Sequence, residues 1–181
     1  MYHNLTLALL LSVLPAVSTA ADSELRFGKV VPGKKGPTTV AELFKSTENL
    51  EIVRSPEKIV ASLLHYVEPK DGHASRDDQY DETQSVAVAV AEEDYSKLKS
   101  ALLRESTYAW DSSKFCSPRY NARIRFHRGD SVVAVDFCFS CRILRIVRDG
   151  RTISSEDFDD SVFLEIMRKF FPNDSVLRKA R

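Results

Sequence analysis

The sequence lacks an excess of charge of either sign. Lysine plus arginine number 26 and aspartate plus glutamate also number 26, so the formal net charge is zero. A chain without net charge has no bulk electrostatic attraction for nucleic acid or for an anionic membrane. The composition therefore gives no indication of a nucleic-acid partner, although a charge count does not describe where the charges lie.

The sequence also lacks the short motifs that mark common catalytic sites. It contains no G-x-S-x-G elbow, no H-E-x-x-H pair and no glycine-rich phosphate loop. Adjacent acids such as Asp77 and Asp78 are typical of solvated segments and helix caps rather than of acid–base pairs. These absences favour a protein that is not an enzyme and that needs no cofactor.

Long apolar runs are absent except at the N-terminus. Residues 1–20 carry no acidic or basic side chain except His3, and residues 5–17 are apolar. Small residues follow, and this order is typical of a secretory signal peptide cut after Ala20 or one residue later. The alternative is an uncleaved membrane anchor, but the run is shorter than the roughly 20 apolar residues that a span needs. We therefore predict a secreted or periplasmic protein with no stable membrane span after cleavage.

The remaining chain is predicted to form one domain behind a flexible leader. Glycine and proline are dense between Gly28 and Pro37, which prevents regular structure and predicts a leader over residues 21–38. The length of 181 residues fits a single further domain over residues 39–181.

Within this domain, three segments have a helical pattern. Residues 39–46 predict a short helix. Residues 92–104 keep one apolar face behind an acidic first turn, which complements the helix dipole. Residues 157–171 have a broad apolar face that ends at Pro172. The tail beyond Pro172 is expected to fray.

Alternating or β-branched segments predict the strands. The segments are residues 58–67 (with a buried helix as the alternative), 85–90, 122–126, 132–139, 142–147 and 151–153. Residues 69–83 are polar and predict a surface loop. Turn signals at residues 127–130 and at Asp149-Gly150 are too short for anything but antiparallel neighbours. The predicted fold class is therefore α+β: an antiparallel β-meander of about four or more strands packed against helices, one of them C-terminal.

The three cysteines, Cys116, Cys138 and Cys141, are the candidate site residues, together with His127. A structural disulfide between Cys116 and either Cys138 or Cys141 suits an exported protein and leaves the third thiol buried. Alternatively, the three thiolates and His127 form a Cys3His zinc site, for which C-x-x-C is a usual spacing. A third interpretation is a thiol–disulfide exchange pair, but such pairs work at a helix N-terminus and these flanks favour strands.

Arginines recur along the predicted strands. Arg123, Arg125, Arg142, Arg145 and Arg148 would bind an anionic partner if they gathered on one sheet face. An ordinary solvated face is the simpler interpretation, because singly spaced charges are normal there.

Several motifs also occur in a recognisable order. Cys116 is followed two residues later by Pro118, then by a V-x-V-x-F-C-F-x-C segment at residues 133–141, and finally by a helix that ends in Phe170-Phe171-Pro172. From about Val86 onward, the chain resembles a group of uncharacterised exported bacterial proteins. The resemblance implies secretion and a cysteine-bearing antiparallel sheet, and it carries over no activity.

Together these patterns predict an exported, non-catalytic binding or interaction domain with structural cysteines and an unknown ligand, for which a protein partner is one candidate. The alternative is a zinc-binding or thiol-redox protein that uses Cys116, Cys138 and Cys141.

Overall fold

The computed structural model describes residues 36–68, 80–82, 86–110, 112, 116–159 and 161–180. The predicted signal peptide, nearly all of the predicted leader and most of the predicted loop 69–83 lie outside these residues. No helix in the described ranges is long and apolar enough to cross a membrane.

The described residues form five α-helices, a short 3-10 helix and eight strands. The helices are α1 (Val40–Phe44), α2 (Thr47–Arg54), α3 (Glu92–Leu102), η1 (Glu105–Thr107), α4 (Val162–Phe170) and α5 (Ser175–Lys179). The strands are β1 (Lys58–Leu63), β2 (His65–Tyr66), β3 (Tyr80–Asp81), β4 (Val88–Ala89), β5 (Ala122–Arg128), β6 (Ser131–Cys138), β7 (Ile143–Arg148) and β8 (Arg151–Asp157). This confirms the predicted α+β fold with an antiparallel sheet and a C-terminal helix.

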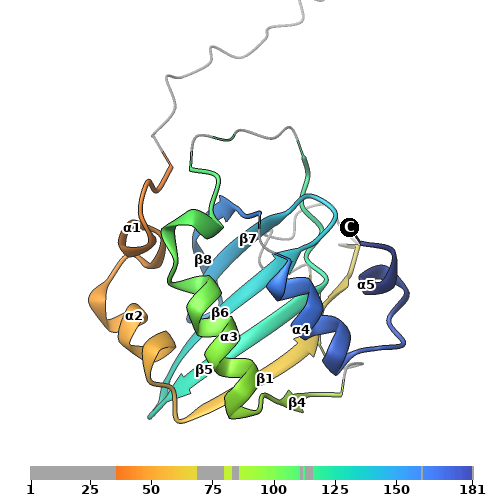
Figure 1. Cartoon of the computed structure of the whole chain (residues 1–181), viewed down its shortest axis with the longest axis horizontal. Helices are drawn as coiled ribbons and strands as arrows, with labels where there is room; N and C mark the ends of the chain where they lie inside the picture. Colours follow the sequence, from red (N-terminus) through yellow and green to blue (C-terminus); the bar gives the residue numbers. More distant parts are fainter. Residues whose placement is uncertain are drawn as a thin grey trace, which may run out of the picture. The chain divides into compact units, whose positions relative to one another are not determined.

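Six strands make the main sheet, in the order β4-β1-β5-β6-β7-β8, and every neighbouring pair is antiparallel. Strands β5 to β8 are neighbours in the sheet in the same order as in the sequence, as predicted for a meander. Strand β1 pairs with the other edge of β5 (Figure 1). Strands β2 and β3 pair only with each other and form a separate two-stranded ribbon.

Two tight turns set the register of the meander. Arg128 pairs with Ser131 around Gly129, which has a φ of 54°. Arg148 pairs with Arg151 around Asp149 and Gly150, whose φ values are 51° and 76°. In the second turn, both central residues, Asp149 and Gly150, have positive φ. Such a turn matches the right-handed twist of the flanking strands, and Asp-Gly is a pair that adopts it readily.

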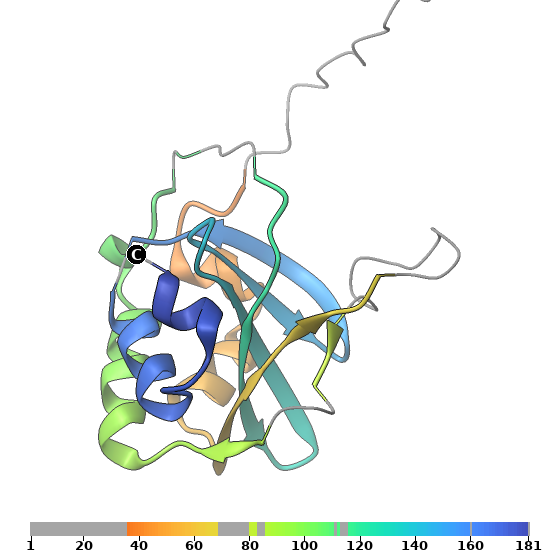
Figure 2. The ribbon, with the colours of Figure 1, turned by 90° about the vertical axis from the view of Figure 1, so that its right-hand side faces the viewer.

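All the helices lie on one side of the main sheet, and the β2–β3 ribbon lies on the other (Figure 2). Alternate side chains of β5 point to opposite faces of the sheet. Ala122, Ile124 and Phe126 are fully buried on the face that the helices cover. Arg123 and Arg125, between them, point to the opposite face, which we call the open face.

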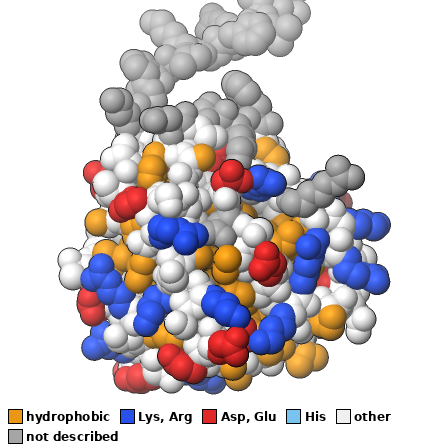
Figure 3. Space-filling view, viewed as in Figure 1, with side chains coloured by type: hydrophobic (Ala, Val, Ile, Leu, Met, Phe, Trp, Pro, Cys, Tyr) orange, Lys and Arg blue, Asp and Glu red, His pale blue; other side chains and the backbone are white. Residues whose placement is uncertain are grey.

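The core between the helices and the sheet contains a cluster of phenylalanines. Phe137 of β6 lies 5.0 Å from Phe163 of α4 between ring centroids, and Phe163 lies 5.3 Å from Phe158. Phe137 and Phe163 have no exposed surface. Edge-to-face and tilted pairs of this kind add to the stabilisation that comes from burial. On the outside of the helical layer, basic, acidic and hydrophobic side chains are intermixed (Figure 3).

The C-terminal segments differ from the sequence-based prediction. The helix predicted from residue 157 begins at Val162, because residues 151–157 continue as strand β8. The predicted fraying of the tail is wrong, since α5 follows Pro172. Its N-cap Asp174 accepts from two backbone N–H groups, and its Leu177 is fully buried. Arg168 of α4 also donates to the carbonyl of Leu177 at 2.9 Å. Caps and buried anchors of this kind hold even a short helix.

The N-terminal part contains one helix that the apolar pattern did not indicate. Helix α2 begins after Ser46, whose hydroxyl accepts from the Asn49 N–H at 3.1 Å. The predicted strand 58–67 is present as β1 and β2, interrupted at Leu64. In the predicted loop 69–83, Tyr80 and Asp81 form strand β3 instead.

Candidate functional site

The open face of the sheet carries an unusual concentration of charge. Three of the five arginines singled out from the sequence, Arg123, Arg125 and Arg145, lie on this face and make ion pairs there. Arg142 lies in the β6–β7 turn, and Arg148 instead reaches Glu48 of α2 at 3.1 Å. Only three of the five arginines therefore share one sheet face, and these three form ion pairs with carboxylates instead of being solvated singly.

Asp136 of β6 is the centre of this arrangement. Its side chain has no exposed surface, and it accepts from Arg123 Nε and Nη2 at 2.5 and 2.8 Å. Arg145 Nε donates to the same carboxylate at 2.7 Å from the neighbouring strand. A buried carboxylate is stable only with such partners. Burial lowers the pKa of Arg123, but the hydrogen bonds and negative charges of Asp136 and Glu82 together outweigh burial and raise the pKa overall.

A second carboxylate, Glu82, reaches the same face from the β2–β3 ribbon. Arg125 donates to both of its oxygens through Nη1 and Nη2, and Arg123 donates through Nη1. The Ser62 hydroxyl lies 3.0 Å from Glu82 Oε2. Burial raises the pKa of Glu82, but the two arginines outweigh it and hold the pKa below its usual value.

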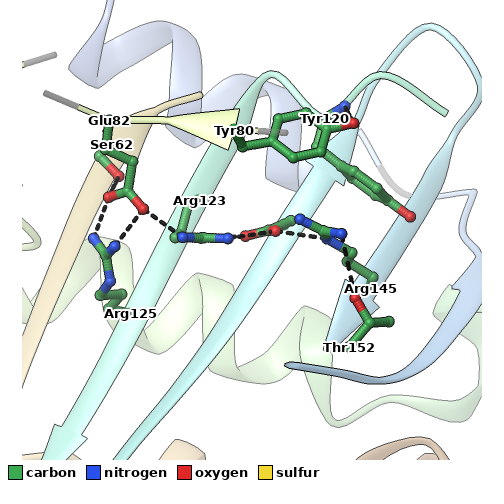
Figure 4. Close-up of polar contacts among 9 residues, drawn as sticks. Ser62, Tyr80, Glu82, Tyr120, Arg123, Arg125, Arg145 and Thr152 are labelled. Carbon is green, nitrogen blue, oxygen red and sulfur yellow. Dashed lines mark hydrogen bonds and ion pairs between the residues drawn. The ribbon is translucent and has the colours of Figure 1, made fainter. Parts of the chain in front are cut away.

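These contacts form one continuous row across the sheet, running Arg125, Glu82, Arg123, Asp136, Arg145 (Figure 4). We call these five residues the charged row. It contains three cations and two anions. At its far end, Arg145 Nη1 donates to Thr152 of β8 at 3.2 Å.

Beyond Arg145 the face is hollowed into a cavity of about 640 Å³, which we call the tyrosine pocket. Its lining includes Tyr66, Tyr80, Arg119, Tyr120, Ile143, Arg145, Thr152 and Ser155. The Arg145 guanidinium lies 4.3 Å from the ring centroid of Tyr120 and 4.9 Å from that of Tyr80. Arg119 lies 5.4 Å from the ring centroid of Tyr66. These cation–π contacts hold cations and rings together in one wall.

The tyrosine rings are also fixed by hydrogen bonds. Tyr80 donates its hydroxyl to the Pro118 carbonyl at 3.3 Å and accepts from the Tyr120 N–H at 3.3 Å. Burial raises the pKa of both Tyr80 and Tyr120, against the opposing charge of Arg145. Both phenols therefore stay protonated at neutral pH.

The cysteines border this pocket. Cys116 and Cys141 form a disulfide with a Cα–Cα distance of 6.2 Å, and this confirms the prediction of a disulfide bond. The bond ties the segment that begins at Cys116 to the β6–β7 turn, and Cys116 itself lines the tyrosine pocket. It also lines a second cavity of about 760 Å³ on the side of α5. The disulfide therefore stands in the wall between two cavities.

Cys138 is the unpaired cysteine. It is fully buried in a small cluster with Leu64, Tyr120 and Cys141, and its Sγ lies 3.4 Å from Ser140 Oγ. Cys138 ends β6, while Cys141 lies in the following turn, so the C-x-x-C segment spans a hairpin turn rather than a regular strand.

His127 lies at the other end of the sheet. It pairs with Lys58 and Val132, whereas Ala122, at the cysteine end of the same strand, pairs with Phe137. The strand rise of about 3.3 Å per residue places His127 roughly 17 Å from that end. Burial, followed by the charges of Lys58 and Arg125, lowers its pKa. The structure does not bring together the four residues of the Cys3His hypothesis. In the part of the chain that is described, no cluster of three or more histidine, cysteine, aspartate or glutamate side chains is arranged for a metal ion.

Sequence reasoning missed most of this site. Glu82, Tyr66 and Tyr80 lie in or beside the segment that was interpreted as a loop. One signal was present for Asp136, because a lone acid inside the apolar run of residues 132–139 has to find a buried partner.

Comparisons of the chain with protein-family models, with curated proteins and with solved structures found no match.

Proposed function

We propose that the protein is an exported, non-catalytic binding domain, that its cysteines serve structure, and that it binds a small anionic ligand in the tyrosine pocket. One observation carries the proposal. The pocket is lined by two arginines and three tyrosines, and no aspartate or glutamate is among the described residues that line it. Its volume of about 640 Å³ is that of a small-molecule site.

The energetics of the open face support a role in recognition. A buried ion network is a poor source of stability, since well-packed apolar residues of similar volume are usually as good or better. Asp136 and Arg145 are nonetheless almost wholly removed from water. A face kept charged at this cost is better explained by binding than by folding.

The chemistry of the lining favours binding over catalysis. Arginine keeps its charge at every physiological pH, and the raised pKa values keep Tyr80 and Tyr120 protonated. Such groups orient an anion but neither gain nor lose a proton near neutral pH. The flat rings suit a ligand with a planar, apolar body, and Arg119, which is exposed, suits its negative charge.

Two features support export. The N-terminal segment has the pattern of a signal peptide, and disulfides persist mainly in oxidising compartments. If the proposal is right, N-terminal sequencing of the exported protein begins at Ala21 or Asp22. A protein that retains residues 1–20 would contradict it.

The binding proposal is tested with three probes of matched shape and different charge: benzoate, benzamide and benzamidine. We expect benzoate to bind most tightly and to shift the backbone amide signals of Tyr66, Arg119 and Thr152 in NMR spectra. Arg119→Gln should remove the preference for the anion, while Arg54→Gln, which changes an exposed arginine of α2, should not. Tightest binding of the cation, or shifts confined to another surface, would overturn the proposal.

The role of the cysteines needs a separate measurement. The purified protein is alkylated after unfolding, its thiols are counted by intact mass, and bound metal is measured by elemental analysis. One thiol and no metal supports the structural role. Three thiols with one equivalent of zinc would establish the metal-binding alternative instead, and three thiols without metal would favour thiol exchange.

A further inference from the structure

The surroundings of Glu82 are those of a bound carboxylate. Both oxygens of Glu82 are engaged by the two terminal nitrogens of Arg125, with Arg123 and Ser62 adding a contact each. A guanidinium fork that meets a carboxylate in this two-pronged way is the most specific geometry proteins use for this group. All three donor residues belong to β1 and β5 of the main sheet, as Figure 4 shows.

The carboxylate itself comes from elsewhere. Glu82 directly follows β3, and among the described residues β2 and β3 are joined by two residue pairs, His65 with Asp81 and Tyr66 with Tyr80. The other carboxylate of the row, Asp136, lies on the central strand β6 and cannot leave without disrupting the sheet. Glu82 can leave the charged row while the main sheet stays intact.

The place that Glu82 fills is partly open to solvent, since the Glu82 side chain is 18% exposed. The Arg125 side chain is 31% exposed, whereas that of Asp136 has no exposed surface. Arg123 and Arg125 line a cavity of about 340 Å³, whose other charged or titratable lining residues are His127, Asp130 and Asp149. A ligand can therefore approach the arginines from this side, away from the tyrosine pocket.

We infer that Ser62, Arg123 and Arg125 form a carboxylate-binding site, that Glu82 fills it in this structure as an internal occupant, and that a carboxylate of a ligand takes Glu82's place. The carboxylate belongs either to a small dicarboxylate or to an acidic peptide segment. The site is distinct from the tyrosine pocket, and the inference stands even if that pocket binds nothing.

Competition by Glu82 has a measurable consequence. When the binding-competent state is only a fraction of the population, the apparent Kd rises by the inverse of that fraction. Removal of the internal occupant must therefore tighten binding of an external carboxylate, with no new contact being made.

The experiment titrates glutarate and, separately, tetraglutamate into the full mature protein at constant ionic strength, with chloride as the reference salt. Binding is followed by NMR through the Nε–Hε signals of Arg123 and Arg125. For Glu82→Ala we expect at least a roughly ten-fold lower Kd than for the wild type. The added change Arg125→Ala should abolish the gain. The matched control is Asp159→Ala, which removes an exposed carboxylate that pairs with Arg142, and it should behave as the wild type.

The two arms identify the source of the carboxylate, because a dicarboxylate site favours glutarate and a peptide site favours tetraglutamate. If Glu82→Ala responds to neither probe beyond the effect of chloride, or no more than Asp159→Ala, the inference is wrong. Should Glu82→Ala fail to fold, Glu82→Gln keeps the shape of the side chain and removes its charge. Unchanged Kd values for Glu82→Gln relative to the wild type would then overturn the inference.

Discussion

The two faces of the main sheet are built from the same strands and differ completely in what they contain. On the helix-covered face, Ile124, Val135 and Phe137 are fully buried among apolar side chains. On the open face, the neighbouring residues include Asp136, which is fully buried, and its ion-pair partner Arg123, which is half-buried. One face therefore supplies the apolar core of the fold, and the other carries the charged residues on which the proposed binding sites depend.

The comparison also separates two kinds of burial. Apolar burial stabilises in proportion to the area removed from water, at about 25 cal/mol per Å². Burial of an ion pair adds little net stability, but removal of one partner is strongly destabilising because the other charge is left buried and unpaired. On the helix-covered face, the loss of stability caused by a substitution should depend on the side-chain volume it removes. On the open face, it should depend on whether the substitution leaves a buried charge without its partner.

The two largest effects are expected at fully buried positions, Phe137 on the helix-covered face and Asp136 on the open face. Phe137→Ala removes a fully buried ring that contacts three other phenylalanines. We expect the free energy of unfolding in urea to fall by about 3–5 kcal/mol. A smaller truncation on the open face, Val132→Ala at a half-buried position, should lower it by about 1 kcal/mol or less. Equal losses would contradict the division of roles between the faces.

Charge balance on the open face is tested at Asp136. Asp136→Asn leaves Arg123 and Arg145 without their shared anion, and we expect a loss of about 3–5 kcal/mol in the free energy of unfolding. The paired change of Asp136→Leu with Arg145→Met removes opposite charges together and should restore most of that stability. If the double variant is as unstable as Asp136→Asn, then side-chain packing rather than charge balance accounts for the stability of the charged row.

The disulfide ties the segment at Cys116, which lines the tyrosine pocket, to the β6–β7 turn, and its removal should have a somewhat smaller effect. It closes a loop between positions 25 residues apart, which corresponds to about 3.5 kcal/mol of unfolding free energy in the chain-entropy account. Cys116→Ala with Cys141→Ala should lower stability by that amount and weaken benzoate binding as well. Cys138→Ala keeps the bridge, and we expect it to retain benzoate binding. Retained binding in the double variant would show that the bridge does not shape the tyrosine pocket.

The smallest effect concerns pH. The pKa of Glu82 is lower in the folded protein, because its arginine contacts outweigh burial, so the unfolded chain binds the proton more readily. Its contribution to stability is therefore fully present above the usual glutamate pKa of about 4.3 and is lost as the pH falls below it. The stability difference between the wild type and Glu82→Gln should shrink in that range, as measured by urea unfolding at a series of pH values. A difference that stays constant would contradict the ion pairing of Glu82.

Local patterns were sufficient for the parts of the fold that depend on near neighbours. The meander of β5 to β8 was predictable because alternation and tight turns act over a few residues, as at Asp149-Gly150. Helix α3 was predictable from its acidic first turn and its apolar face.

The site was less predictable, because its partners are distant in sequence. Glu82 and Arg125 are 43 residues apart, and nothing local in a polar segment indicates that pairing. Cys116 pairs with Cys141 rather than Cys138 because the chain turns after Cys138, and the turn brings the later cysteine to the bridge. Helix α5 was missed because its stability comes from Arg168 and the buried Leu177 rather than from its own short sequence.

The edges of the main sheet have a consequence for encounters between copies of the chain. Strand β8 carries an extra residue, Ile153, where its register with β7 shifts, and such a bulge twists an edge away from flat pairing. It begins with the exposed Arg151, and the Ala109 N–H donates to Asp157 at its end. The opposite edge, β4, is only two residues long. Short, bulged and charged edges discourage strand addition between molecules, so this sheet is suited to remaining dispersed at high concentration.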